Sequence, residues 1–173
     1  MKKTKTLIIN NEKVFILLQF LTLLSIATIA PMIGNQLITG SIVNAILFIT
    51  VMLLGVRAGI LISIIPSFVA LFSGIISITL IPIIPIVILG NILLILCFNF
   101  LKEKKYWIKI FFSSLLKFIF IFSFSNLFLN LILKREIIQK LIVNMGYFQL
   151  LTALSGGILA FFIVKFINKG KIS

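Results

Sequence analysis

Six long apolar segments occupy most of this 173-residue chain and constrain its fold more than any other feature. The segments cover residues 14–33, 41–54, 58–80, 82–101, 107–133 and 146–167. A bilayer core about 30 Å thick is crossed by roughly 20 apolar residues in an α-helix, and most of these segments approach or exceed that length. Because backbone groups in lipid must be hydrogen-bonded within the protein, we predict an all-α integral membrane bundle of about six transmembrane helices in a single domain.

The charge of the chain is strongly positive, with 16 lysine and arginine residues against three acidic residues. Most of the basic residues lie in short clusters between the apolar segments. Anionic headgroups and the positive-inside rule explain such clusters, so we expect contact with the lipid bilayer and no binding of nucleic acid. With cytoplasmic termini, twelve basic residues fall on the cytoplasmic side and three outside. This asymmetry predicts a multi-pass protein of the cell (plasma) membrane with both termini inside.

Residues that support bond chemistry are scarce. The chain has no histidine or aspartate, a single cysteine, Cys97, and three glutamates near the predicted ends of spans. A metal site, a redox centre or a proton relay at membrane depth needs more of these groups. A glycine-rich phosphate loop ending in Gly-Lys-Ser/Thr is also missing, so the chain is not expected to hydrolyse ATP. We therefore expect no enzyme activity, no bound metal and no other cofactor.

Uncharged polar residues gather in the predicted outer half of the bundle. They come from residues 34–44, where a polar loop is expected up to residue 40, from the outer half of segment 107–133 and from the first turns of segment 146–167. The members are Asn35, Gln36, Thr39, Asn44, Ser123, Asn126, Asn130, Gln149, Thr152 and Ser155. Such residues either form a pocket that is open to the exterior or hydrogen-bond one helix to another, and both interpretations stay open.

Lys117 is the most informative single residue, because it lies near the bilayer midplane, where a charge is costly. We expect it to face the bundle interior, where it would bind an anionic substrate or a counter-charge, or else to snorkel toward the inner face. Asn91, beside Gly90, is a second interior candidate. Ser41 is a predicted helix N-cap, and the small residues between Ala153 and Ala160 predict close approach of the last helix to a neighbour.

Several short stretches, spread over most of the chain, carry a family resemblance. They are APMIGNQLITGSIVNA at residues 30–45, AGIL at 58–61, IPS at 65–67, GN at 90–91, YW at 106–107, LKF at 116–118 and QLLTALSGG at 149–157. The chain resembles small bacterial membrane proteins that are similar to the substrate-binding S components of energy-coupling-factor (ECF) transporters. The resemblance implies capture of a vitamin-like molecule from outside, with the loop after the first helix as a lid. It also implies a separate transmembrane coupling subunit and two ATPase subunits as partners.

The sequence therefore predicts the substrate-capture subunit of such an importer, for a small-molecule substrate. The predicted substrate-binding residues are Asn35, Gln36, Asn44, Asn91, Lys117, Asn126, Asn130 and Gln149. Two alternatives remain. A passive channel would need polar residues along one helix face to the cytoplasm, and a structural membrane subunit without its own substrate would use its amides only to join helices.

Overall fold

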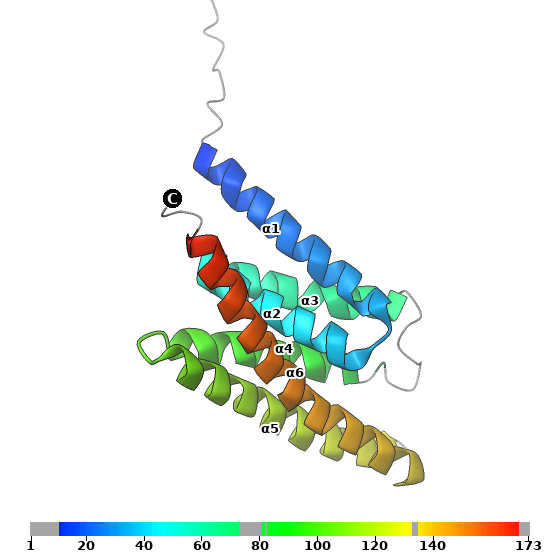
Figure 1. Ribbon diagram of the computed structural model, residues 1–173. Coiled ribbons are helices and arrows are strands. Elements are labelled where there is room, and N and C mark those ends of the chain that lie inside the picture. The colour runs from blue at the N-terminus through cyan, green and yellow to red at the C-terminus, as the bar shows by residue number, and fades with distance from the viewer. Residues whose placement is uncertain (1–10, 73–80, 82, 133–134, 170–173) are drawn as a thin grey trace, which may run out of the picture.

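The computed structural model describes residues 11–72, 81, 83–132 and 135–169, which form a helical bundle (Figure 1). Side chains are described except at residues 70, 128–132, 135–146 and 168–169. The elements are α1 (Asn11–Ile29), the short 3-10 helix η1 (Ala30–Ile33), α2 (Gln36–Leu54), α3 (Val56–Phe72), α4 (Ile84–Phe100), α5 (Tyr106–Ile132) and α6 (Arg135–Lys169). The described residues contain six α-helices and no strand, which confirms the predicted all-α class.

Four helical segments in the described part of the chain are long and apolar enough to cross a membrane. They are Asn11–Ile33, Gln36–Leu54, Tyr106–Leu127 and Tyr147–Ile167. The apolar stretches of α3 and α4, Val56–Val69 and Ile84–Phe100, are shorter. Large apolar side chains such as Phe111, Leu127 and Phe162 are exposed on the outside of the bundle, as expected for surfaces that face lipid. These features indicate a membrane protein.

The predicted start of the second helix at Ser41 was wrong, because α2 begins at Gln36. Asn35 is its N-cap, and the Asn35 side chain accepts hydrogen bonds from the backbone N–H groups of Leu37 and Ile38 at 3.0 and 3.2 Å. An asparagine in this position satisfies the otherwise unpaired donors of the first turn. The polar run that looked like a loop is therefore mostly the first turn and a half of α2.

The other predicted helices differ from the observed ones at their ends. α1 continues into η1 and stops at Gly34, whose φ of +72° is a left-handed conformation that favours glycine. α3 runs through Pro66 and is described as far as Phe72, and the rest of the prediction, up to residue 80, is not tested. Residues 73–80 and 82 lie outside the described part of the chain. α6 begins at Arg135, eleven residues before its predicted start at residue 146.

The bundle has two distinct ends, because consecutive helices run in opposite directions (Figure 1). One end holds the start of α1, the α2–α3 junction, the α4–α5 turn and the end of α6. We call it the basic end, since it carries Lys13, Arg57, Lys165 and the lysines of residues 102–105. The other end holds the end of α1 with the start of α2, the end of α3 with the start of α4, and the end of α5 with the start of α6.

α2 is the central helix, and every residue from Asn44 to Val51 is buried. α6 crosses it closely at Gly156, where a Cβ atom would lie 2.7 Å from the Asn44 Cβ and 2.8 Å from the Ala45 backbone nitrogen. Only glycine permits that approach, because backbone atoms cannot move aside. The predicted close contact of the last helix with a neighbour is thus confirmed.

The half of the bundle next to the basic end is filled by apolar side chains, here called the apolar core. It includes Leu47, Phe48, Leu94, Ile95, Phe98 and Ile110. The rings of Phe48 and Phe98 lie 4.9 Å apart. At its edge the hydroxyl group of Tyr106 donates a hydrogen bond to the backbone oxygen of Gly157 at 2.9 Å, so α5 is tied to α6 beside the core.

Candidate functional site

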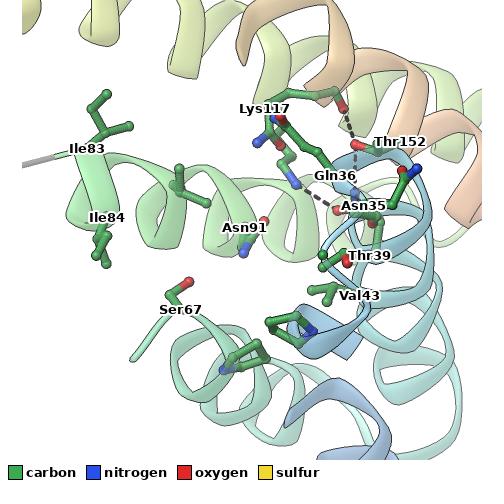
Figure 2. A pocket seen from close by; sticks show the side chains of 17 residues that line it. Asn35, Gln36, Thr39, Val43, Ser67, Ile83, Ile84, Asn91, Lys117 and Thr152 are labelled. Carbon is green, nitrogen blue, oxygen red and sulfur yellow. Dashed lines mark hydrogen bonds between the residues drawn. The ribbon is translucent and has the colours of Figure 1, made fainter. Parts of the chain in front are cut away.

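A cavity of about 340 Å³ lies in the half of the bundle away from the basic end (Figure 2). Side chains from η1, the first half of α2, α3, the start of α4, the middle of α5 and α6 surround it. The lining residues are Pro31, Gly34, Asn35, Gln36, Thr39, Gly40, Val43, Asn44, Pro66, Ser67, Ile83, Ile84, Val87, Asn91, Lys117, Gln149 and Thr152. Its volume is within the range of sites that take small molecules, at the lower end.

Lys117 lies inside the bundle and does not snorkel to a surface. Its side chain is 2% exposed, and its Nζ donates a hydrogen bond to the Oδ1 of Asn44 at 2.6 Å. Gly90 of α4 leaves room for the neighbouring Ile121 of α5, because a Cβ atom at that position would lie 2.6 Å from side-chain atoms of Ile121. The interior orientation expected for this lysine is therefore the observed one.

Asn44 is the centre of a hydrogen-bond network that joins three helices. Its Oδ1 accepts from Lys117 of α5, and its Nδ2 donates to the Thr152 Oγ1 of α6 at 3.3 Å and to the Gly40 oxygen of its own helix at 2.8 Å. The Thr152 hydroxyl in turn donates to the backbone oxygen of Gln149 at 3.2 Å. With both Nδ2 protons and Oδ1 in use, the Asn44 amide is fixed in one orientation, which also fixes the end of Lys117.

Asn91 is buried at the cavity wall, and its Oδ1 has no hydrogen-bond partner among the described residues. Figure 2 shows Asn91 among the cavity residues, on α4 between the regions of Lys117 and Ser67. Buried acceptors are nearly always hydrogen-bonded in folded proteins. This oxygen is therefore a buried acceptor without a described partner, on a residue that lines the cavity.

The rim of the cavity is formed where α1 turns into α2. Asn35 and Gln36 are exposed there, and the hydroxyl group of Thr39 donates to the Ala30 oxygen at 2.9 Å, which ties the start of α2 to η1. Gln149 of α6 lies half-buried at the cavity wall. Thus the segment that the family resemblance assigns to a lid borders the cavity as the beginning of a helix.

Six of the eight predicted binding residues line this one cavity: Asn35, Gln36, Asn44, Asn91, Lys117 and Gln149. Asn126 does not line it, and its Nδ2 donates to the Phe122 oxygen one turn earlier in α5 at 3.0 Å. The side chain of Asn130 lies outside those described. Binding of a substrate by any of these residues stays a prediction.

Sequence reasoning missed the apolar part of the wall and Ser67. Ile83 is the N-cap of α4, and Ile84 and Val87 lie in its first turn, whereas Ser67 follows Pro66 inside α3. Apolar wall residues give no signal in a chain that is apolar throughout. Proline inside a helix does give one, because it removes a backbone hydrogen bond and marks a place where helices do not pack in the regular way.

The electrostatics of the cavity are simple. Among its described lining residues Lys117 is charged, and none is an aspartate or a glutamate. Among the described residues, no three or more His, Cys, Asp or Glu side chains lie together in a way that could hold a metal ion. The wall therefore offers one cation, several amide and hydroxyl groups and an apolar surface, which is a set suited to binding a small molecule.

The sequence matches no protein-family model, and neither a curated protein nor a solved structure matches the chain.

Proposed function

We propose that this chain is the substrate-capture subunit of an ECF-type importer in the bacterial plasma membrane. The cavity of about 340 Å³ carries the proposal, because it combines a buried lysine, a fixed amide network and an unpartnered acceptor in one small space. Its place is also suitable. If the basic end faces the cytoplasm, as the positive-inside rule requires, the cavity lies in the outer half of the bundle.

The family resemblance supports this assignment at the level of individual stretches. The resembling stretches 30–45, 65–67, 90–91, 116–118 and 149–157 all contribute residues to the cavity wall. They come from six different elements, η1 and α2 to α6, so their meeting at one cavity is not a consequence of closeness in sequence. In this proposal the energy for uptake comes from two ATPase subunits through a transmembrane coupling subunit.

Capture fits the structure better than a passive channel does. A channel needs a continuous polar path, but the half next to the basic end is filled by Phe48, Phe98, Ile110 and their neighbours in the apolar core. A purely structural role gives no reason for a cavity of about 340 Å³ whose wall includes a buried lysine and the Asn91 amide. Both observations favour a receptor whose cavity is closed toward the basic end by the apolar core.

Native mass spectrometry of the affinity-purified chain tests the proposal. We expect a retained small molecule, and in mild detergent we expect co-purification of one membrane protein and two ATPases. Val87→Phe, which places a ring in the cavity, should abolish retention of the small molecule. Leu89→Phe is the matched control, since Leu89 lies two residues later on α4 and is exposed on the outside. A chain that retains nothing and co-purifies with no ATPase would contradict the proposal.

The orientation is tested separately by thiol labelling. In a Cys97→Ala background, a membrane-impermeant maleimide applied to intact cells should label Gln36→Cys at the rim of the cavity and should not label Lys104→Cys at the basic end. The reverse pattern would place the cavity on the cytoplasmic side and end the case for capture from outside.

A further inference from the structure

Resting on the capture function proposed above, we propose that the captured molecule is a small monocarboxylate with an N–H or O–H donor and an apolar body. Its carboxylate binds Lys117, its donor binds the Asn91 oxygen, and its apolar body lies against the first turn and a half of α4. The geometry of three wall features points to this class.

The first feature is the ammonium group of Lys117. The protein holds it in place, but only part of its hydrogen-bond donors have a described partner. The Nζ of Lys117 makes one described hydrogen bond, to Asn44, whereas an ammonium group has three donors. Asn44 cannot neutralise the lysine, because an amide carries no charge. A buried cation without a carboxylate beside it is costly at membrane depth, and a bound anion offsets this cost.

The second feature is the balance of charge. Lys117 is the one charged residue among the described lining residues, and no carboxylate of the protein lines the cavity there. A phosphate ester carries about −1.5 to −2 charges at neutral pH, so it would leave negative charge uncompensated in a mostly apolar site. A carboxylate carries one negative charge and matches the single lysine.

The third feature is the complementary pair of Asn91 and the apolar wall. The Asn91 Oδ1 accepts from no described residue, so a donor on the ligand would pair it. Ile83 and Ile84 are buried beside the cavity, and Val87 is half-buried one turn further along α4. This wall suits a ring or a short hydrocarbon chain, and a cavity of about 340 Å³ restricts it to a compact molecule.

A matched set of indole compounds tests these three contacts by isothermal titration of the full chain in detergent. The set is indole-3-acetic acid, indole-3-acetamide and tryptamine, which differ in charge on one ring, and 1-methylindole-3-acetic acid, which lacks the ring N–H. We expect the acid to bind about tenfold or more tightly than the amide or the amine, since one charge-assisted hydrogen bond distinguishes them. We also expect the acid to bind more tightly than its N-methyl analogue.

Variants assign the preferences to residues. Lys117→Met should remove the preference for the acid, and so should Lys117→Gln, which keeps a donor for Asn44 if the methionine variant fails to fold. Asn91→Leu should remove only the preference for the free N–H. Lys165→Met is the control for charge, because Lys165 is exposed on α6 away from the cavity, and it should change neither preference.

The outcomes separate this inference from the proposed function. Equal or tighter binding of the amide or the amine, or an acid preference that survives both Lys117 variants, overturns the inference. If no indole compound binds, the charge of the molecule that co-purifies with the chain tests the inference instead. A retained acid that is lost in Lys117→Gln supports the inference, whereas a retained neutral or cationic molecule overturns it and leaves the capture function standing. If the chain retains no molecule and binds no probe, both the inference and the proposed capture function are overturned.

Discussion

The two halves of the bundle are built from the same helices but differ in what fills them. Toward the basic end, the apolar core packs Phe48, Phe98 and Ile110 together, whereas the other half encloses the cavity. On α2, Asn44 faces the cavity and Phe48, one turn later, lies in the core. On α4, Asn91 and Ile95 have the same relation.

On each of these helices, polar residues at the cavity and apolar residues in the core follow one another on the same inward face. Lys117 and Ile110 are seven residues apart on α5, so they share one face of the helix, and both are buried. The interior face is therefore continuous from the cavity into the core. Side-chain chemistry, and not a break in the helices, sets where the cavity ends.

Phe48→Ala should give the largest loss of stability, because it empties the centre of the core. Phe48 is 0% exposed, and its ring lies 4.9 Å from that of Phe98. Packing contacts hold helices together in lipid, and removal of a buried phenylalanine costs about 4 kcal/mol of unfolding free energy. Titration with a denaturing detergent, followed by dye labelling of Cys97 on α4, measures this change.

The same titration on Phe166→Ala provides the control, since Phe166 is 80% exposed. Its cost should be below about 0.5 kcal/mol. Retention of the co-purified molecule by folded Phe48→Ala should match the unmutated chain, because Phe48 does not line the cavity. A selective loss of retention without loss of stability would mean that the two halves are not separate in function.

Asn44→Leu should have the next largest effect, and it should lower both the stability of the bundle and the retention of the co-purified molecule. Leucine has a similar shape but gives Lys117 no acceptor, and an unpaired buried donor costs about 2 kcal/mol. Retention of the co-purified molecule should fall as well, because the end of Lys117 is no longer held. The same substitution in a Lys117→Met background should cost much less, and equal costs in the two backgrounds would show that the pair is not coupled.

The sequence was sufficient for the fold class and for much of the candidate site, for identifiable reasons. A chain this apolar lies in lipid, where backbone groups must be hydrogen-bonded within the protein and helices are favoured. The helices could therefore be located from length and hydropathy. Polar residues are rare in such a chain, and those in the interior attract attention individually. Asn44, Asn91 and Lys117 could therefore be selected before their contacts were known.

The rotation of each helix about its axis could not be predicted in the same way. Asn126 and Lys117 are nine residues apart, which is about two and a half turns, so they lie on opposite sides of α5. Burial of Ile110, Lys117 and Ile121 shows which side faces inward. Both Lys117 and Asn126 were predicted to bind substrate, but burying the lysine is the stronger requirement, and it turns Asn126 away from the cavity.

The beginning of α2 was missed because a polar run has two explanations. Gly40 and Ser41 look like a loop and a cap in sequence, but Gly40 is where α2 approaches α6, and a Cβ atom there would lie 2.8 Å from the Thr152 Cγ2. The Ser41 hydroxyl bonds to Ser155 of α6 at 2.6 Å. The contacts that explain Gly40 and Ser41 are thus more than a hundred residues away in sequence, whereas the N-cap at Asn35 is a local signal that was missed.

Thr152→Val should have the smallest effect of the three, and it measures how far the network depends on Asn44 alone. Valine keeps the shape of threonine but removes the acceptor for the Asn44 Nδ2, which keeps its other bond to the Gly40 oxygen. Hydrogen bonds between helices contribute about 0.6 kcal/mol on average in membrane proteins, so the same detergent titration should show a change of about that size. Thr28→Val, which removes a bond within α1, is the matched control. A cost as large as that of Asn44→Leu would mean that Thr152, rather than Asn44, holds Lys117 toward the cavity.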